Sequence, residues 1–193
     1  MTTVVSHMSM SLDGFVTGPN ASPDQPLGAG GRRLHDWLFD QATERDAEMH
    51  RAMIEATGAT VMGRRSYDQA AGDRGWGDGG PLGRTPCFVL SHSVPERISA
   101  PAVFTFVSDG IASAIDQAGK VAGDREVSLH GATALQQALR VGLVDQVHVH
   151  LVPILLGGGV RLFDHLGPDQ IELERTEVVE TAAVTHLRFR VLR

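Results

Sequence analysis

Residues 126–139 read EVSLHGATALQQAL, and this stretch decides the fold class. In its first half, Val127 and Leu129 alternate with polar residues, as in a strand with one buried face. Its second half repeats apolar residues at the spacing of a helix face: Ala134, Leu135, Ala138 and Leu139. Gly131 lies between the two halves. The stretch therefore predicts a strand that turns directly into a helix at one glycine.

A turn of this kind offers a seat for a phosphate group. The first amide hydrogens of a helix have no partner inside the helix, and they lie at the positive end of its dipole. Gly131 has no side chain that would keep a phosphate away. The alternative is that the glycine serves backbone geometry only, which is its commoner use at such turns. The stretch by itself leaves both interpretations open.

A second turn of the same kind follows residues 59–62, ATVM, which predict a short strand closed by Gly63. The next helix begins with Arg64 and Arg65, at the end of the helix dipole that disfavours positive charge. This placement favours a nearby anion that offsets the two arginines. A solvated helix start is the alternative.

The remainder of the chain alternates strands with helices. Strand patterns occur at residues 4–10, 86–90, 103–107, 145–153, 171–179 and 184–191. Helical spacing predicts one or two helices within residues 33–57 and another over 111–118. Residues 20–31 are rich in glycine and proline, which favours an active-site loop. This order of elements predicts an α/β fold, with a mostly parallel sheet and a mixed edge.

Composition narrows the class of protein. A chain of 193 residues fits a single domain, residues 1–193, with a sizeable core. No apolar run is long enough for a membrane span and no secretory signal is visible, so we expect a soluble, cytoplasmic protein. The net charge of −6 argues against nucleic acid as a partner. The single cysteine, Cys87, excludes a thiolate metal cluster and is expected to be a small buried hydrophobe.

The motifs, taken in order, resemble the dihydrofolate reductase superfamily, and most closely the reductase domain of the bifunctional riboflavin-pathway deaminase-reductase. The resemblance covers nearly the whole chain and rests on residues 10–14, 61–67, 75–78, 89–91, 130–132, 143–145, 152–159 and 162–163. It implies a dihydrofolate reductase-like three-layer fold, whose mainly parallel sheet has about eight strands with an antiparallel C-terminal strand. It also implies NADPH as the cofactor, hydride transfer as the reaction and a homodimer as the assembly.

The same resemblance assigns residues to the parts of the cofactor. The pyrophosphate would lie on the amides of Gly131, Ala132, Thr133, Ala134 and Leu135. Independently of the resemblance, His130 is a candidate donor to a phosphate, and the alternative is a histidine packed at the strand end, which is the commoner case. The adenosine 2′-phosphate would lie among Gly63, Arg64, Arg65, Ser66, Ser91 and His92, because a phosphomonoester favours guanidinium and hydroxyl donors. The nicotinamide would lie near Val16, Thr17 and Gly18, opposite residues 157–159.

The chain departs from the family at one point. The family has two adjacent glycines where this chain has His130-Gly131, or Gly131-Ala132 if the alignment shifts by one residue. The backbone freedom that a glycine pair allows is therefore reduced here.

The substrate side has weaker signals. The candidate substrate residues are Trp37, Trp76, Asp78, Pro153 and Gly158. Two aspartates are candidate catalytic acids: Asp36 near the first helix, and Asp13 before Gly14. An aspartate before glycine also forms turns by bonding to nearby backbone, which is the alternative for Asp13. His148 and His150 share one strand face but have no third ligand nearby, so we predict core or interface positions for them and no metal site.

Two functions follow from these patterns. The first is an NADPH-dependent reductase that transfers a hydride to a small heterocyclic substrate, most similar to 5-amino-6-(5-phosphoribosylamino)uracil reductase or a dihydrofolate reductase-like enzyme. The second is an NADP(H)-binding protein of the same fold without turnover, because the sequence places no acid securely beside the nicotinamide. A zinc deaminase domain is excluded, since its cysteine pair cannot exist in a chain with one cysteine.

Overall fold

The computed structural model describes residues 2–69, 79–98 and 100–193. The strands are β1 (Val4–Ser11), β2 (Phe15–Thr17), β3 (Thr57–Gly63), β4 (Cys87–Leu90), β5 (Phe104–Val107), β6 (Glu126–His130), β7 (Gln146–Val152), β8 (Val160–Arg161), β9 (Leu173–Glu180) and β10 (Thr185–Val191). The helices are the 3-10 helix η1 (Gly31–His35), α1 (Asp36–Phe39), α2 (Glu44–Ala56), α3 (Arg64–Gln69), α4 (Ile111–Ala122) and α5 (Ala132–Arg140). The strand-glycine-helix turns predicted at Gly63 and Gly131 are both present.

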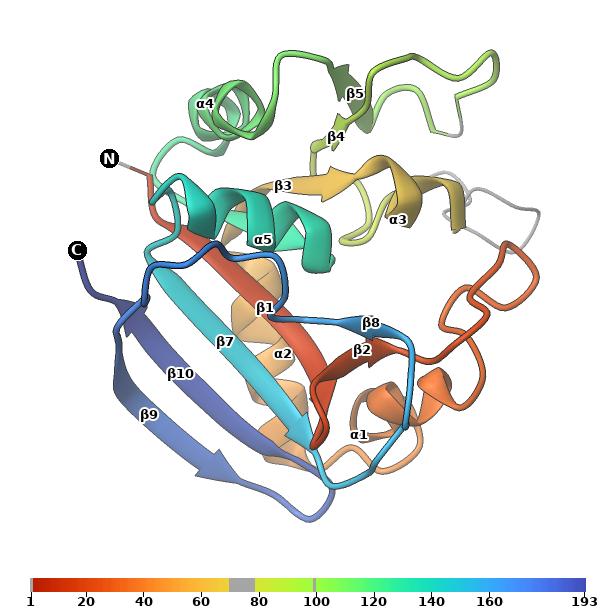
Figure 1. Cartoon of the computed structure of the whole chain (residues 1–193), viewed down its shortest axis with the longest axis vertical. Coiled ribbons are helices and arrows are strands. Elements are labelled where there is room, and N and C mark those ends of the chain that lie inside the picture. Colours follow the sequence, from red (N-terminus) through yellow and green to blue (C-terminus); the bar gives the residue numbers. More distant parts are fainter. Residues whose placement is uncertain (1, 70–78, 99) are drawn as a thin grey trace.

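The main sheet has eight strands in the order β5-β4-β3-β6-β1-β7-β10-β9. The strands from β5 to β7 pair in parallel, and β10 runs antiparallel to both β7 and β9. The predicted fold class, a mainly parallel sheet with an antiparallel C-terminal strand, is confirmed. Helices α4 and α5 lie on one side of the sheet and α2 on the other, which makes three layers (Figure 1).

The two faces of the sheet differ in chemistry because successive strand residues point to opposite faces. The face under α4 and α5 is apolar and includes Val4, Val127, Leu129, Val147 and Val149, all buried. The face under α2 carries a line of polar residues on neighbouring strands instead: His7, Ser9, His148, His150 and His186. The placement of His148 and His150 on one face is as predicted.

The segment between residues 33 and 57 divides into η1, α1 and α2. Helix α2 begins with a capping box, in which the Thr43 hydroxyl accepts from the Asp46 amide and the Asp46 carboxylate accepts from the Thr43 amide. A small second sheet, β2 with β8, was absent from the sequence prediction, since strands of two or three residues are too short to show alternation. Cys87 is buried as expected, and burial raises the pKa of its thiol.

The carboxyl ends of the parallel strands meet along one edge of the sheet, where α3 and α5 begin. The strands β2 and β8 and the helix η1 lie at the same edge (Figure 1). In open α/β sheets ligands bind outside this edge. The fold therefore brings together most of the predicted site residues.

Candidate functional site

The two strand-glycine-helix turns lie against each other. A Cβ atom placed on Gly131 would come within 2.7 Å of the Ser66 hydroxyl, and a Cβ on Gly63 would lie 3.7 Å from Thr133. Gly131 also has a φ of +87°, in the region that side-chain-bearing residues avoid. Glycine at 131 is thus required both by backbone conformation and by the close approach of α3.

The start of α5 carries free hydrogen-bond donors. No side chain caps the helix, and its first turn contains no acidic residue. The amides of Ala132, Thr133 and Ala134 belong to this first turn and have no acceptor inside the helix. The first and last amides of the predicted set already have acceptors. The Gly131 amide donates to the Met8 sulfur at 3.4 Å, and the Leu135 amide donates to the Gly131 carbonyl at 3.4 Å. The donors available to an anion are therefore the three amides between them.

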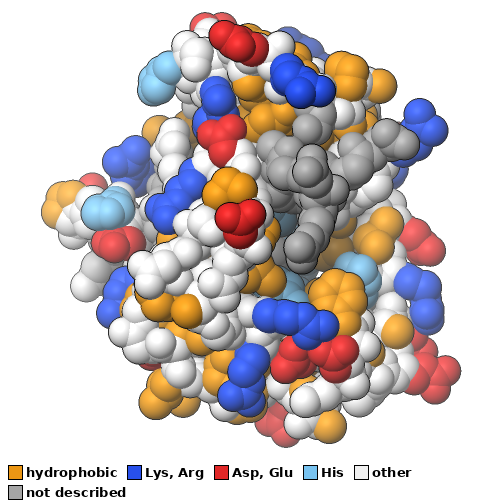
Figure 2. Space-filling model, turned by 90° about the vertical axis from the view of Figure 1, so that its right-hand side faces the viewer, with side chains coloured by type: hydrophobic (Ala, Val, Ile, Leu, Met, Phe, Trp, Pro, Cys, Tyr) orange, Lys and Arg blue, Asp and Glu red, His pale blue; other side chains and the backbone are white. Residues whose placement is uncertain are grey.

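A cleft of about 450 Å³ opens in front of these turns, and we call it the central cleft. It is lined by Met8, Val16, Thr17, Pro26, Leu27, His35, Gly63, Arg64, Arg65, Ser66, Gln69, Leu90, His130, Gly131, Ala132, Thr133, Gln137 and Val160. Figure 2 views this end of the strands and shows the face hollowed near its centre, with histidine side chains at the hollow. Most of the predicted cofactor residues line the cleft.

Several lining residues were missed by the sequence analysis. Pro26 and Leu27 belong to the loop for which an active-site role was favoured, so the signal for them was present. His35 and Gln137 lie on helical segments with no distinguishing pattern, and only the packing brings them to the cleft. The side chains of Ala134 and Leu135, which belong to α5, are buried, so only the backbone of this part of the helix faces the site.

Arg64 connects the α3 turn to the end of β4. Its guanidinium donates to the Asp68 carboxylate at 2.7 Å, to the Ser91 hydroxyl at 3.0 Å and to the Ser93 carbonyl at 2.9 Å. Asp68 is thus one anion that offsets the charge at the helix start. Ser91 and His92 lie with Arg64 in a neighbouring recess of about 320 Å³. The predicted 2′-phosphate residues are therefore divided between two adjoining hollows.

Arg65 differs from Arg64 in its surroundings. Its side chain is exposed at the central cleft, and within the described ranges it has no ion pair or hydrogen bond. A guanidinium that faces a cleft without a counterion is available to an anionic ligand.

Two histidines in the central cleft are neutral at neutral pH. Burial lowers the pKa of His130 to about 4, with a further contribution from His35. Burial also lowers the pKa of His35, although a backbone hydrogen bond at Gly31 and the charge of Asp36 act against it. Neutral imidazoles can donate or accept single hydrogen bonds to a ligand, but they bring no charge.

Close packing within the chain requires glycine near the predicted nicotinamide position. A Cβ atom on Gly18 would meet the Ala29 carbonyl at 1.9 Å, and a Cβ on Gly159 would meet the Thr17 carbonyl at 1.9 Å. A Cβ atom on Gly158 would lie 4.0 Å from the Pro19 Cβ. Gly18 thus lets the loop after β2 fold closely on itself, and Gly159 packs the loop before β8 against the end of β2. Val16 and Thr17 line the central cleft, whereas Gly18 does not.

Asp13 has a structural role. Its carboxylate accepts from the Ser11 hydroxyl at 2.6 Å and from the amides of Leu156 and Gly157 at 3.1 and 2.7 Å. The Ser11 hydrogen bond is the largest cause that lowers the pKa of Asp13 to about 2, and the two amides add to it. An ionised carboxylate held in this way cannot supply a proton at neutral pH, so the geometry argues against Asp13 as the catalytic acid.

The other acid and the substrate candidates are scattered. Asp36 lies 3.8 Å from the Arg32 guanidinium and does not line the central cleft. Trp37 is buried, and its indole nitrogen donates to the Ser9 hydroxyl at 3.0 Å. Pro153 is exposed and also lies outside the cleft lining. Trp76 and Asp78 lie outside the described residues.

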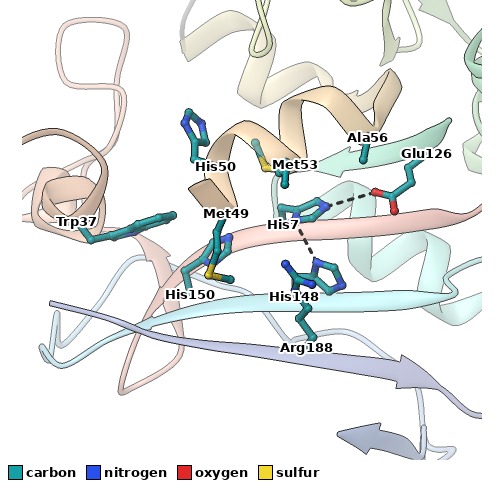
Figure 3. Close-up of a pocket in the computed structure, with 11 residues that line it drawn as sticks. His7, Trp37, Met49, His50, Met53, Ala56, Glu126, His148, His150 and Arg188 are labelled. Carbon is teal, nitrogen blue, oxygen red and sulfur yellow. Dashed lines mark hydrogen bonds and ion pairs between the residues drawn. The ribbon is translucent and has the colours of Figure 1, made fainter. Parts of the chain in front are cut away.

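Trp37 instead borders a second hollow, between α2 and the sheet, which we call the histidine cavity. Its volume is about 170 Å³, and it is lined by His7, Trp37, Met49, His50, Ala52, Met53, Ala56, Glu126, His148, His150 and Arg188. Figure 3 shows His7, His148 and His150 on the sheet side, and His50 with the two methionines on the α2 side. In the described part of the chain, no three His, Cys, Asp or Glu residues are placed to hold a metal ion.

Comparison with known proteins identifies the family. The sequence profile of the RibD C-terminal domain matches residues 2–187. The chain belongs to the RibD C-terminal domain family. Within the described residues, no helix of this family member is long and apolar enough to cross a membrane.

Solved structures with the same fold support the assignment of this RibD C-terminal domain protein. A protein from Shewanella sp. PV-4 that is assigned to riboflavin biosynthesis aligns over 100% of both chains, with 25% identity and a TM-score of 0.74. The deaminase/5-amino-6-(5-phosphoribosylamino)uracil reductase of Thermotoga maritima aligns over 99% of this chain and 57% of its own, with 13% identity and a TM-score of 0.64.

The dihydrofolate reductase of Enterococcus faecalis, solved with NADP(H), aligns over 98% of this chain and 96% of its own, with 10% identity and a TM-score of 0.59. At this identity the similarity establishes the common fold only. A search of curated proteins found no match.

Proposed function

We propose that this protein is an NADPH-dependent reductase that transfers a hydride to a small heterocyclic substrate, most similar to 5-amino-6-(5-phosphoribosylamino)uracil. One observation carries the proposal: the uncapped start of α5 faces the arginine-bearing start of α3 across a single cleft. Membership of the RibD C-terminal domain family supports it.

The residues fit a phosphorylated dinucleotide. The amides of residues 132–134 would hold the pyrophosphate, since they are donors without acceptors at the positive end of a helix. Gly131 leaves room for the phosphate, because a side chain there would fill the gap to Ser66. Arg65 would bind the 2′-phosphate, and Arg64 would hold Ser91 and the β4 end beside it. When bound, the cofactor supplies the hydride.

The substrate would lie next to the nicotinamide end of the cleft. A further recess of about 550 Å³ adjoins the central cleft there, and the two share Pro26, Leu27 and His35. His35 and His130 are neutral, so they would orient a polar heterocycle through hydrogen bonds rather than through charge. These residues would hold the substrate carbon within reach of the cofactor.

One observation favours the second candidate, an NADP(H)-binding protein without turnover. The described lining of the central cleft contains no aspartate or glutamate, and Asp13 is committed to the loop at residues 156–157. With no acid in that lining, the proton of a reductase would come from solvent, from the substrate, from a histidine or from an acid outside the lining, such as Asp24 of the adjoining recess.

Ligand binding and turnover separate these candidates. NADPH should raise the melting temperature of the purified protein, and quench its tryptophan fluorescence, more than NADH at the same concentration. Equal or negligible effects of the two cofactors would reject the cofactor assignment. NADPH oxidation should then be followed with aminouracils, pterins and quinones. Binding without oxidation of NADPH by any of them would favour the non-catalytic candidate.

The double variant Arg64→Ala with Arg65→Ala tests the 2′-phosphate position. It should bind NADPH and NADH equally, because both guanidinium groups near that phosphate are gone. The matched control is Arg45→Ala with Arg51→Ala, two exposed arginines on α2 that do not line the cleft. This control should keep the preference for NADPH. A preference that survives in the first variant would place the 2′-phosphate elsewhere.

A further inference from the structure

The histidine cavity has room for a small molecule. Its volume of about 170 Å³ is close to that of engineered apolar cavities, about 150 Å³, that bind benzene. The strands β1, β6, β7 and β10 supply the sheet side of the cavity, and α2 covers the other side (Figure 3). A single six-membered ring therefore fits between the sheet and Met49 and Met53.

Hydrogen bonds determine which nitrogen atoms of His148 and His7 carry protons. Burial lowers the pKa of His148 to about 3, helped by His7 and Arg188, so His148 is neutral. Its Nε2 lies 3.0 Å from the Gln146 Oε1, an acceptor, and must donate. Its Nδ1 is then an acceptor for the His7 Nδ1–H, 3.2 Å away. The His7 Nδ1–H is thus engaged by His148, and the His7 Nε2 is left to face Glu126.

A second chain of hydrogen bonds runs from Asp46 through His186 to His150. Burial alone would raise the pKa of Asp46, but hydrogen bonds from Thr43 and His186 outweigh it and lower the pKa, so the carboxylate is ionised. His186 donates to it through Nε2 at 2.9 Å. The His186 Nδ1 lies 2.8 Å from the His150 Nδ1, so one of these two nitrogens donates to the other. Burial lowers the pKa of His150, so its ring is neutral and carries one proton.

The sheet side of the cavity thus presents ring nitrogens and a carboxylate, from His7, His148, His150 and Glu126. The His7 Nε2 is buried without a hydrogen-bond partner among the described residues, and it lies 3.8 Å from the Glu126 carboxylate. A donor placed between the His7 Nε2 and the Glu126 carboxylate would satisfy both. His150 adds a further ring nitrogen to the lining.

The one cation in the lining does not supply that donor. The Arg188 guanidinium pairs with the Glu177 carboxylate at 2.8 Å, outside the cavity lining. A single metal ion is also disfavoured, because no three potential ligands in the described residues are suitably placed. Apart from His50 on α2, the remaining walls are apolar, with Trp37, Met49 and Met53.

We propose that the histidine cavity binds a single-ring molecule that carries an amino group, such as an aromatic amine or an amino-substituted heterocycle. The amino group donates to the His7 Nε2 and to the Glu126 carboxylate, and the ring packs between the methionines of α2 and the sheet. The cavity shares no lining residue with the central cleft, so this inference does not rest on the reductase proposal.

Aniline and toluene test the proposal, since they have the same shape and differ only in the amino group. Binding to the full-length protein at pH 7.5 is measured by NMR titration of its amide signals. Aniline should bind about tenfold more tightly than toluene, because its N–H groups satisfy buried acceptors. Equal binding would mean a merely apolar cavity and would overturn the proposal. Tighter binding of benzoate than of aniline would overturn it as well, by indicating an anion site at Arg188.

Variants and competition locate the bound amine. Glu126→Leu should reduce the preference for aniline over toluene to about threefold or less, because one acceptor is removed. Glu55→Leu, at an exposed glutamate outside the cavity lining, should leave the preference unchanged. Glu126 is half-exposed, so its loss should not unfold the protein, which the melting temperature verifies. An unchanged preference in Glu126→Leu, or displacement of aniline by NADPH, would place the amine elsewhere and reject the site.

Discussion

The central cleft and the histidine cavity lie on the same sheet but select opposite ligands. The cleft offers donors: first-turn amides of α5 and the exposed guanidinium of Arg65. The cavity offers the carboxylate of Glu126 and the Nε2 of His7, which has no hydrogen-bond partner among the described residues. The first arrangement suits a polyanion, and the second suits a neutral amine.

The difference has a topological cause. At the carboxyl ends of parallel strands, helices begin with unpaired amide hydrogens, so backbone chemistry dominates there. In the middle of the sheet all backbone groups are paired, so only side chains can define a site. Met8 and His7 illustrate this, since consecutive residues of β1 serve the cleft and the cavity respectively. Function at the cleft should therefore depend on backbone geometry, and at the cavity on side-chain pairing.

The largest effect is expected for Asp46→Ala. This variant removes the partner of His186 and the capping box of α2, so the free energy of unfolding should fall by about 3–5 kcal/mol. Urea unfolding measures this loss. Asp116→Ala, which breaks an exposed pair with Lys120, should change the free energy by about 0.5 kcal/mol or less. NADPH affinity should be unaffected in both variants, and a large loss of affinity in Asp46→Ala would show that the two regions are coupled.

A smaller effect is expected for Gly131→Ala. The new methyl group meets the Ser66 hydroxyl and the backbone is strained at a φ of +87°, so NADPH affinity should fall about 10- to 100-fold, which is about 1.4–2.8 kcal/mol. Isothermal titration calorimetry measures the affinity. Gly123→Ala serves as the control, because its φ is +63° and nothing lies within 4 Å of the added Cβ. If both variants lose affinity equally, general backbone strain rather than the cleft geometry is responsible.

A more gradual effect is expected in the dependence of stability on pH. His148 and His130 have folded-state pKa values lowered to about 3 and about 4 by burial, whereas the unfolded chain titrates near 6.5. The unfolded state therefore binds more protons as the pH falls below about 6.5, and the folded state loses about 1.4 kcal/mol per pH unit for each histidine. Urea unfolding between pH 7.5 and pH 5 should reveal this slope.

A histidine substitution assigns the slope to the cavity. His148→Gln should make stability less dependent on pH, because one group with a lowered pKa is gone. His165→Gln, at an exposed histidine, should leave the slope unchanged. Stability that stays constant between pH 7.5 and pH 5 would contradict the buried neutral histidines on which the cavity depends.

Sequence reasoning reached the cleft more readily than the cavity. Gly131, Gly63 and the arginine pair were recognisable because strand alternation, a glycine and helical spacing are local patterns. The loop containing Pro26 and Leu27 was marked by composition. By contrast, the sequence offered Asp13 as a candidate catalytic acid, and its actual role depends on which groups lie opposite it in the fold. The amides of Leu156 and Gly157 that hold it come from a loop far along the chain.

The sequence by itself determined the fold class, the order of the main-sheet strands and the longer helices, and the positions of the two turns, since these depend on residues within one element. Only the tertiary structure decided that His7, His148, His150 and His186 converge beneath α2, because that requires β1, β7 and β10 to be neighbours in one particular register. A shift of one residue in that register would turn each histidine to the opposite face. Local pattern specifies where an element is, and the pairing of distant strands specifies which side chains meet.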